Sequence, residues 1–254
     1  MRCIVVLVIL GTVAVSGQAD LRIQGGSATS IATYPYTAAL LLRSPTAANF
    51  RLTCAGVIVN TRSILTAASC VAGDSTSRWR VRVGSSSSIS GGRLLTINLI
   101  RVHSSYRAAT RDFDIAMLRT TTSFVQTHLI RAARFASSGY TLVAPQTVTA
   151  VGWGATVSGG APVSTIRHVR LNIINQTTCA NNYRGRGITV TANMVCAGWI
   201  GGRGQCTGDT GGPLVHNGVV VGIFSRSIGC GQANLPGINT RISRFAGWIT
   251  MNRF

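Results

Sequence analysis

The stretch from Cys206 to Pro213 places hydroxyl groups, a carboxylate and three glycines within eight residues, reading Cys-Thr-Gly-Asp-Thr-Gly-Gly-Pro. Thr210 follows Asp209 directly and is followed by two glycines. A threonine hydroxyl is a competent nucleophile toward a carbonyl carbon where an amine or another base activates it. If this hydroxyl acts as a nucleophile, the rest of the chain has to supply the base.

The same eight residues resemble the nucleophile loop of the chymotrypsin/trypsin family, Gly-Asp-Ser-Gly-Gly-Pro, with threonine in the place of serine. In that family the hydroxyl attacks the scissile carbonyl, and two backbone N–H groups bind the resulting oxyanion. The resemblance assigns these N–H groups to Gly208 and Thr210. It also implies that Asp209 pairs with a newly cut N-terminus.

Two further stretches resemble the remaining catalytic positions of that family. Leu65-Thr66-Ala67-Ala68-Ser69-Cys70 is similar to Leu-Thr-Ala-Ala-His-Cys, so Ser69 stands where the family has its histidine base. A serine hydroxyl is not basic near neutral pH. Asp114, in Asp114-Ile115-Ala116-Met117-Leu118, matches the third member, and we expect it to accept a hydrogen bond from Ser69. The histidines lie outside these motifs, at His103, His128, His168 and His216.

These replacements predict a non-catalytic homolog that acts by binding. Loss of the nucleophile or its base costs on the order of 10⁶ in kcat, whereas the oxyanion donors and substrate binding retain roughly 10³–10⁴ over water. The expected partners are protease inhibitors, active proteases or microbial surface ligands. The alternative is a weak endopeptidase with Thr210 as its nucleophile. We expect no cofactor, and no metal site, because neither CxxC pairs nor clustered Cys/His spacing occur.

The residues that resemble the specificity pocket of the family are also altered. Trypsin-like members place an aspartate six residues before the nucleophile, to bind arginine or lysine; this chain has Gly204 there. The wall segment that resembles Ser-Trp-Gly reads Ser225-Arg226-Ser227, and Gly237 is assigned to the same pocket. Arg226 replaces a flat apolar ring, and Ser227 adds a side chain where glycine admits the substrate. Peptide binding in the usual register should be weaker.

The first residues read as a secretory signal peptide, predicted over residues 1–19. A basic start is followed by an apolar run over residues 4–15 and by small residues before the expected cut. The run is too short to span a bilayer, and no later stretch is apolar for long enough. We therefore expect a secreted, extracellular protein with no membrane anchor.

Residues 20–22 are predicted to be an activation peptide. Arg22 precedes Ile23-Gln24-Gly25-Gly26, which resembles the junction that a trypsin-like protease cuts in this family. The resemblance implies that the freed amine of Ile23 pairs with Asp209, which supplies the counter-charge that a buried carboxylate needs. An activating trypsin-like protease is thus an expected partner.

Six cysteines follow the predicted signal peptide, and an even number in a secreted chain suggests three disulfides. The sequence alone leaves the connectivity open. The resemblance selects the pairs Cys54–Cys70, Cys179–Cys196 and Cys206–Cys230.

Many short β-type runs separated by Gly/Ser turns predict an all-β fold. The resemblance implies a trypsin-like domain over residues 23–254, built of two six-stranded antiparallel β-barrels at about 23–135 and 136–240. The catalytic cleft should lie between the barrels. Ile242, Phe245, Trp248 and Ile249 have helical spacing, which predicts a C-terminal helix.

The chain carries a formal net charge of +19, and all of its basic side chains are arginine. Arginine keeps its charge at a pH where lysine loses it, which favours an alkaline fluid. The resemblance to trypsin-like proteases of the lepidopteran larval gut suggests the gut lumen. Electrostatic attachment to polyanions is a second interpretation of the charge. A third is compositional drift toward arginine on a solvated surface, without a function. Asn175-Gln176-Thr177 is a possible glycosylation site.

Overall fold

The computed structural model describes residues 25–199 and 201–254. The predicted signal peptide and the junction between Arg22 and Ile23 lie outside the described residues. Within the described part of the chain, no helix is long and apolar enough to cross a membrane.

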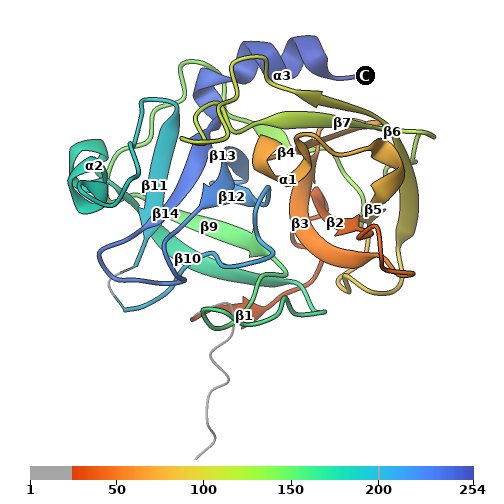
Figure 1. The fold of residues 1–254 in the computed structure, drawn as a ribbon, viewed down its shortest axis with the longest axis horizontal. Coiled ribbons are helices and arrows are strands. Elements are labelled where there is room, and N and C mark those ends of the chain that lie inside the picture. The colour runs from red at the N-terminus through yellow and green to blue at the C-terminus, as the bar shows by residue number, and fades with distance from the viewer. Residues whose placement is uncertain (1–24, 200) are drawn as a thin grey trace, which may run out of the picture.

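The first barrel is closed by six antiparallel strands in the order β2-β3-β4-β7-β6-β5 (Figure 1). Alternation along β5 shows why these residues form a barrel wall: Trp79, Val81 and Val83 are buried, whereas Arg80 and Arg82 between them are partly exposed. The strands are β2 (Thr37–Leu42), β3 (Arg51–Ile58), β4 (Ser63–Thr66), β5 (Trp79–Val83), β6 (Arg93–Val102) and β7 (Ala116–Thr120).

The second barrel runs in the order β9-β10-β11-β14-β13-β12 and closes because β12 pairs with β9. Two short strands join it from earlier in the chain: β1 (Ser27–Ala28) pairs with β10, and β8 (Arg134–Phe135) pairs with β13. The barrel strands are β9 (Thr147–Gly152), β10 (Arg167–Ile174), β11 (Met194–Gly198), β12 (Pro213–His216), β13 (Val219–Arg226) and β14 (Gly237–Arg241).

The helices are short and lie outside the barrel walls. They are α1 (Ala68–Val71), the 3₁₀ turns η1 (Thr76–Arg78) and η2 (Ile242–Arg244), α2 (Gln176–Tyr183) and α3 (Ala246–Asn252). The C-terminal helix is confirmed as α3, and the separate turn η2 precedes it, with Phe245 between the two. Ile242, Phe245 and Ile249 are buried in a core cluster shared with the barrel strands. The predicted all-β fold of two six-stranded antiparallel barrels is therefore correct.

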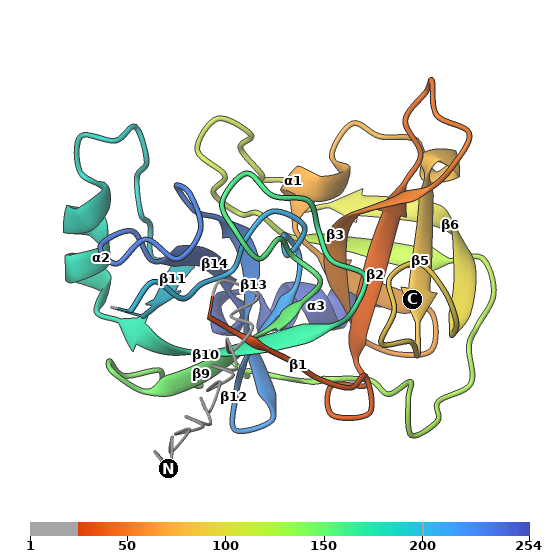
Figure 2. The same cartoon turned by 90° about the horizontal axis from the view of Figure 1, so that it is seen from below.

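One buried cluster joins the two barrels. Leu65 of β4 and Met117 of β7 share it with Leu214 of β12 and Ile223 of β13. Figure 2 shows the barrels side by side, each with its own strands wrapped round its core. Burial of large apolar side chains stabilises a fold by about 1.5–3 kcal/mol for each, so this shared cluster holds the barrels in one relative orientation.

The three disulfides are those that the resemblance implied, Cys54–Cys70, Cys179–Cys196 and Cys206–Cys230. Cys54–Cys70 ties β3 to α1, and Cys206–Cys230 ties the segment before Asp209 to the segment after β13. Disulfides of this kind persist in oxidising compartments.

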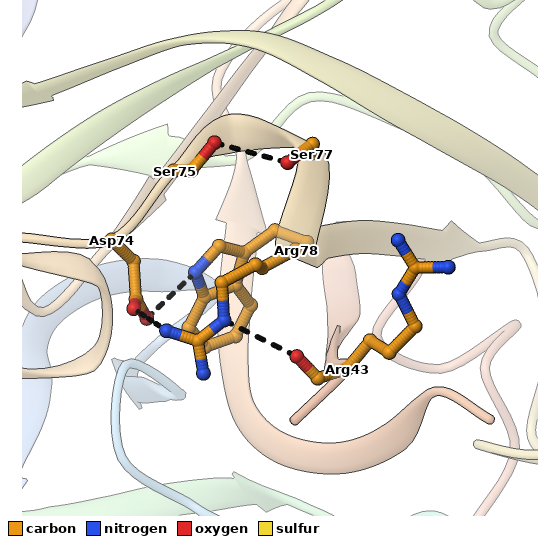
Figure 3. Close-up of polar contacts among 6 residues, drawn as sticks. Arg43, Asp74, Ser75, Ser77 and Arg78 are labelled. Carbon is orange, nitrogen blue, oxygen red and sulfur yellow. Dashed lines mark hydrogen bonds and ion pairs between the residues drawn. The ribbon is translucent and has the colours of Figure 1, made fainter. Parts of the chain in front are cut away.

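The connection between α1 and β5 is held by Asp74 (Figure 3). Its carboxylate pairs with the guanidinium of Arg78 and accepts a hydrogen bond from Trp79 Nε1 at 3.1 Å. Arg78 Nε in turn donates to the carbonyl oxygen of Arg43 at 3.2 Å. This small network fastens the loop that follows α1 to the end of β2.

Candidate active site

A cavity of about 690 Å³ is lined by residues of both barrels. The first barrel contributes Cys54 and Ser69, and the second contributes the segment around Thr210 and the end of β13. Both views place α1, which carries Ser69, at the junction of the barrels (Figures 1 and 2). Residues that are far apart in the sequence thus meet at one concave site.

Asp114 is buried beneath the cavity and accepts three hydrogen bonds through its carboxylate. Ser69 donates two of them, from its backbone N–H to Oδ1 at 2.6 Å and from its hydroxyl to Oδ2 at 2.9 Å. Ser225 Oγ donates to Oδ2 at 2.6 Å. The predicted hydrogen bond between Ser69 and Asp114 is therefore present, and it directs the Ser69 proton away from the cavity.

The loop that carries Thr210 is built on buried Asp209. The Asp209 carboxylate accepts the N–H groups of Gly154, at 2.7 Å, and of Cys206, at 3.0 Å. A Cβ atom at Gly154 would lie 2.2 Å from Asp209 Oδ2, so only glycine leaves room for the carboxylate there. Burial raises the pKa of Asp209 to about 6, against the two N–H groups, which lower it. Within the described residues, no cation pairs with this carboxylate.

The backbone N–H groups around Thr210 divide into two sets. Those of Asp209, Gly211 and Gly212 donate to carbonyl oxygens. Those of Gly208 and Thr210, the two predicted oxyanion donors, make no hydrogen bond within the part of the chain that the structure describes. Gly208 has φ +95°, a conformation that glycine adopts at little cost. The Thr210 hydroxyl likewise forms no hydrogen bond with any described residue.

The predicted pocket residues fall into two groups. Ser225, Arg226 and Ser227 line the cavity, whereas Gly204 and Gly237 are buried behind it. A Cβ atom at Gly204 would lie 3.0 Å from the backbone nitrogen of Gly231, which is a close contact.

Two side chains near the site did not emerge from the sequence. Gln205 is only 2% exposed, and neither its amide oxygen nor its nitrogen has a hydrogen-bond partner among the described residues. The signal for Gln205 in the sequence was its position directly after Gly204, which the resemblance assigns to the specificity pocket. Arg111 lines the cavity and donates from Nη1 to the carbonyl oxygen of Ser225 at 2.8 Å. It lies three residues before Asp114, but nothing in that spacing shows which way its side chain points.

None of the four histidines lines the cavity. His103 stacks on Phe113 with ring centroids 5.0 Å apart. His168 Nδ1 is 2.7 Å from the hydroxyl of Tyr34, and His216 Nδ1 is 2.8 Å from the hydroxyl of Tyr140. These three imidazoles thus have structural partners away from Thr210.

The chain is similar to known peptidases over nearly its whole length. Residues 23–249 match the family model described as Trypsin. The chain is 46% identical over 256 residues to "Trypsin, alkaline B" of Manduca sexta, covering 99% of this chain and 100% of the relative. It is 46% identical over 245 residues to "Trypsin CFT-1" of Choristoneura fumiferana, covering 96% and 95%. Over 218 residues it is 46% identical to "Achelase-1" of Lonomia achelous, covering 84% and 100%.

These comparisons correct the expectation of a non-enzyme that works as an inhibitor decoy, a protease cofactor or a defence recognition protein. Relatives named as trypsins match the chain almost end to end, which favours a peptidase. The expectation gave full weight to Ser69 and Thr210, whereas the surrounding framework keeps a hydroxyl on the loop, two unengaged N–H groups and a buried carboxylate. The chain belongs to the chymotrypsin/trypsin family of serine proteases.

Proposed function

We propose that this chain is a secreted endopeptidase that uses Thr210 as its nucleophile. The observation that carries the proposal is the pair of unengaged N–H groups at Gly208 and Thr210, next to a hydroxyl that lines a cavity between two barrels. Preorganised donors of this kind stabilise the oxyanion of acyl transfer, and one such donor contributes a factor of about 10²–10³ to kcat.

The reaction follows the two steps of acyl transfer. Thr210 Oγ1 attacks the scissile carbonyl carbon, and the oxyanion is held by the N–H groups of Gly208 and Thr210. Collapse of this intermediate breaks the C–N bond, the leaving amine takes up a proton, and water then hydrolyses the threonine ester. The two oxyanion donors needed for both steps correspond to those that trypsins use.

The proton of Thr210 needs an acceptor, and in this proposal the acceptor is the Asp114 carboxylate, reached through Ser69, which already donates to Oδ2 at 2.9 Å. Thr210 and Ser69 line the same cavity without a hydrogen bond between them, so the first transfer requires the two hydroxyls to come into contact when substrate binds. A carboxylate accepts a proton less readily than an imidazole at neutral pH. We therefore expect turnover that is slower than in a histidine-based trypsin by at least about 10²-fold, the low end of the contribution of a positioned base, and by up to about 10⁶-fold, the cost of losing the base in an enzyme of this chemistry.

Two features support secretion followed by activation through cleavage after Arg22. The three disulfides suit an oxidising compartment. Asp209 is buried without a cation among the described residues, and a freed amine at Ile23 would supply one. The all-arginine composition and the relatives named as alkaline trypsins fit an alkaline fluid such as a gut lumen.

The direct test is covalent labelling of the nucleophile. The chain would be expressed behind a fusion partner whose removal leaves Ile23 as the N-terminus, so that no trypsin is added to the sample. A fluorophosphonate probe should then label Thr210, with the adduct located by peptide mass spectrometry. Thr210→Ala, the matched control, should be neither labelled nor able to hydrolyse peptide esters. Absence of both labelling and hydrolysis in the unmodified chain would overturn the proposal.

A further inference from the structure

Two arginines line the cavity that contains Thr210, and no acidic residue of the described part of the chain lines it. Arg111 comes from the segment before Asp114, and Arg226 is the last residue of β13. The remaining polar lining consists of neutral groups, including the hydroxyls of Ser69 and Ser227. A cavity with low-dielectric walls and charge of one sign concentrates ligands of the opposite sign.

Each guanidinium is held in place by one hydrogen bond to the segment that carries the other arginine. Arg111 Nη1 donates to the carbonyl oxygen of Ser225 at 2.8 Å, and Arg226 Nη2 donates to the carbonyl oxygen of Thr110 at 2.6 Å. A guanidinium has five N–H donors. Arg226 Nε is buried and has no partner among the described residues. Both guanidiniums are thus positioned, and each keeps a terminal nitrogen without a hydrogen bond to any described residue, Nη2 of Arg111 and Nη1 of Arg226.

The two charges also lie close enough to act on each other. Burial lowers the pKa of Arg226 from its ordinary value, and the charge of Arg111 lowers it further. The charge of Asp114 acts in the opposite direction. The Asp114 carboxylate accepts its hydrogen bonds from Ser69 and Ser225, and among the described residues neither guanidinium is in ion-pair contact with a carboxylate.

We propose that Arg111 and Arg226 together bind the carboxylate of an acidic side chain in the peptide substrate. This inference rests on the proposed peptidase function and names its substrate class. A guanidinium matches a carboxylate with two parallel N–H···O bonds, and such charge-assisted bonds are about twice as strong as neutral ones. Ser227, a small neutral residue, follows Arg226, and the described residues form no long charged pocket there for the side chain at the cleaved position. The acidic side chain therefore lies at a peptide position other than the one cleaved.

The test measures binding separately from turnover. Thr210→Ala, which cannot be acylated, would be titrated with fluorescent hexapeptides of alanine in which one position at a time carries Glu or Gln. At one position Glu should bind about tenfold more tightly than Gln, as expected for one charge-assisted pair. The advantage should shrink when salt is raised, because partly exposed charges are screened. Equal binding of Glu and Gln at every position would overturn the inference.

Variants of the two arginines assign the effect. Arg226→Gln and Arg111→Gln, in the Thr210→Ala background, should each remove most of the preference for Glu, and Arg226→Glu should favour Lys at the same position. Arg131→Gln is the matched control, because Arg131 is exposed, lies outside the cavity and changes the net charge equally. A preference that survives both cavity variants, or that falls equally in Arg131→Gln, contradicts the inference. Absence of turnover by the unmodified chain would leave this binding result intact and count only against the peptidase.

Discussion

Individual residues decide how fast this site can work. Asp114 accepts hydrogen bonds from the hydroxyl and the N–H of Ser69, so the position of the base is filled by a hydroxyl, which is not basic near neutral pH. Asp209 lies deeper, where the backbone of Gly154 and Cys206 solvates it in place of a cation. The first arrangement should affect the rate of the reaction, and the second should affect how stability depends on pH.

Restoring an imidazole at position 69 should accelerate the reaction. Ser69→His places a base next to Asp114, and we expect kcat for a peptide anilide to rise by roughly 10²–10⁴-fold. The kcat should follow the ionisation of one group near pH 6–7. Ser69→Ala serves as the control and should show no gain. If Ser69→His is no faster than the unmodified chain, Thr210 is not aligned for attack.

The uncut chain should lose stability as the pH rises through the titration of Asp209. Its folded pKa of about 6 lies above the unfolded value, so the folded chain keeps a proton that the unfolded chain releases. The free energy of unfolding should fall by up to about 3 kcal/mol between about pH 4 and pH 6. Urea titrations over this pH range should show that the free energy of unfolding of Asp209→Asn changes less with pH than that of the unmodified chain. Identical profiles for the two proteins would contradict the assignment.

At the scale of elements, short segments position the site. The end of β13 supplies Ser225 to Asp114 and Arg226 to the cavity. The short helix α1 is tied to β3 by the Cys54–Cys70 disulfide at its third residue, and the loop after it is held by Asp74.

Removing the Asp74 carboxylate should destabilise this connection. Trp79 is completely buried, and in Asp74→Ala its indole N–H would lose its acceptor. We expect the free energy of unfolding to fall by about 1–3 kcal/mol. Most of the loss should come from the indole, because the pair with partly exposed Arg78 adds little. In a double-mutant cycle, Asp74→Ala should therefore lower the free energy of unfolding by less in the Trp79→Phe background than in the unmodified chain. An equal decrease in both backgrounds would assign the lost stability to the pair with Arg78.

A repaired site should not recognise arginine at the cleavage position. In the double variant with Ser69→His and Thr210→Ser, Gly204 offers no carboxylate, and an unpaired buried guanidinium is unfavourable by several kcal/mol. Ser227 narrows the entrance beside it. A library of anilide substrates should thus show cleavage after Ala or Val in preference to Arg. A clear preference for Arg would show that Gly204 does not form the floor of the pocket.

At the scale of the whole molecule, two barrels share a buried cluster and hold their loops at one cavity. The proposed activation joins distant parts of this arrangement, because Arg22 and Asp209 lie in different regions of the chain. If activation proceeds by cleavage after Arg22, as proposed, it depends on a second protease, because no acidic residue among the described ones lines the cavity to bind arginine.

The uncut chain should therefore not activate itself. Incubation of the purified chain alone should leave its N-terminus unchanged, whereas added trypsin should expose Ile23, as read by N-terminal sequencing. Arg22→Gln, the control, should resist trypsin at this junction. Spontaneous appearance of Ile23 in the chain incubated alone would contradict this prediction.

The sequence by itself determined the family, the all-β architecture, the C-terminal helix and, through the resemblance, the disulfide pairs. These features depend on local patterns, such as the alternation in Trp79–Val83, and on motifs that stay intact around Cys54, Cys70 and Cys206. The hydrogen bond from Ser69 to Asp114 was also predictable, because both motifs are continuous in the chain.

Only the tertiary structure decided what surrounds these motifs. Arg111 and Arg226 lie 115 positions apart and meet because the barrels bring their segments together, each donating to the other segment's backbone. Gln205 is buried next to Gly237, and its amide has no hydrogen-bond partner among the described residues. The raised pKa of Asp209 follows from burial, which depends on how the whole chain covers it. Side-chain direction, burial and charge proximity are properties of the packed fold, so no local pattern contains them.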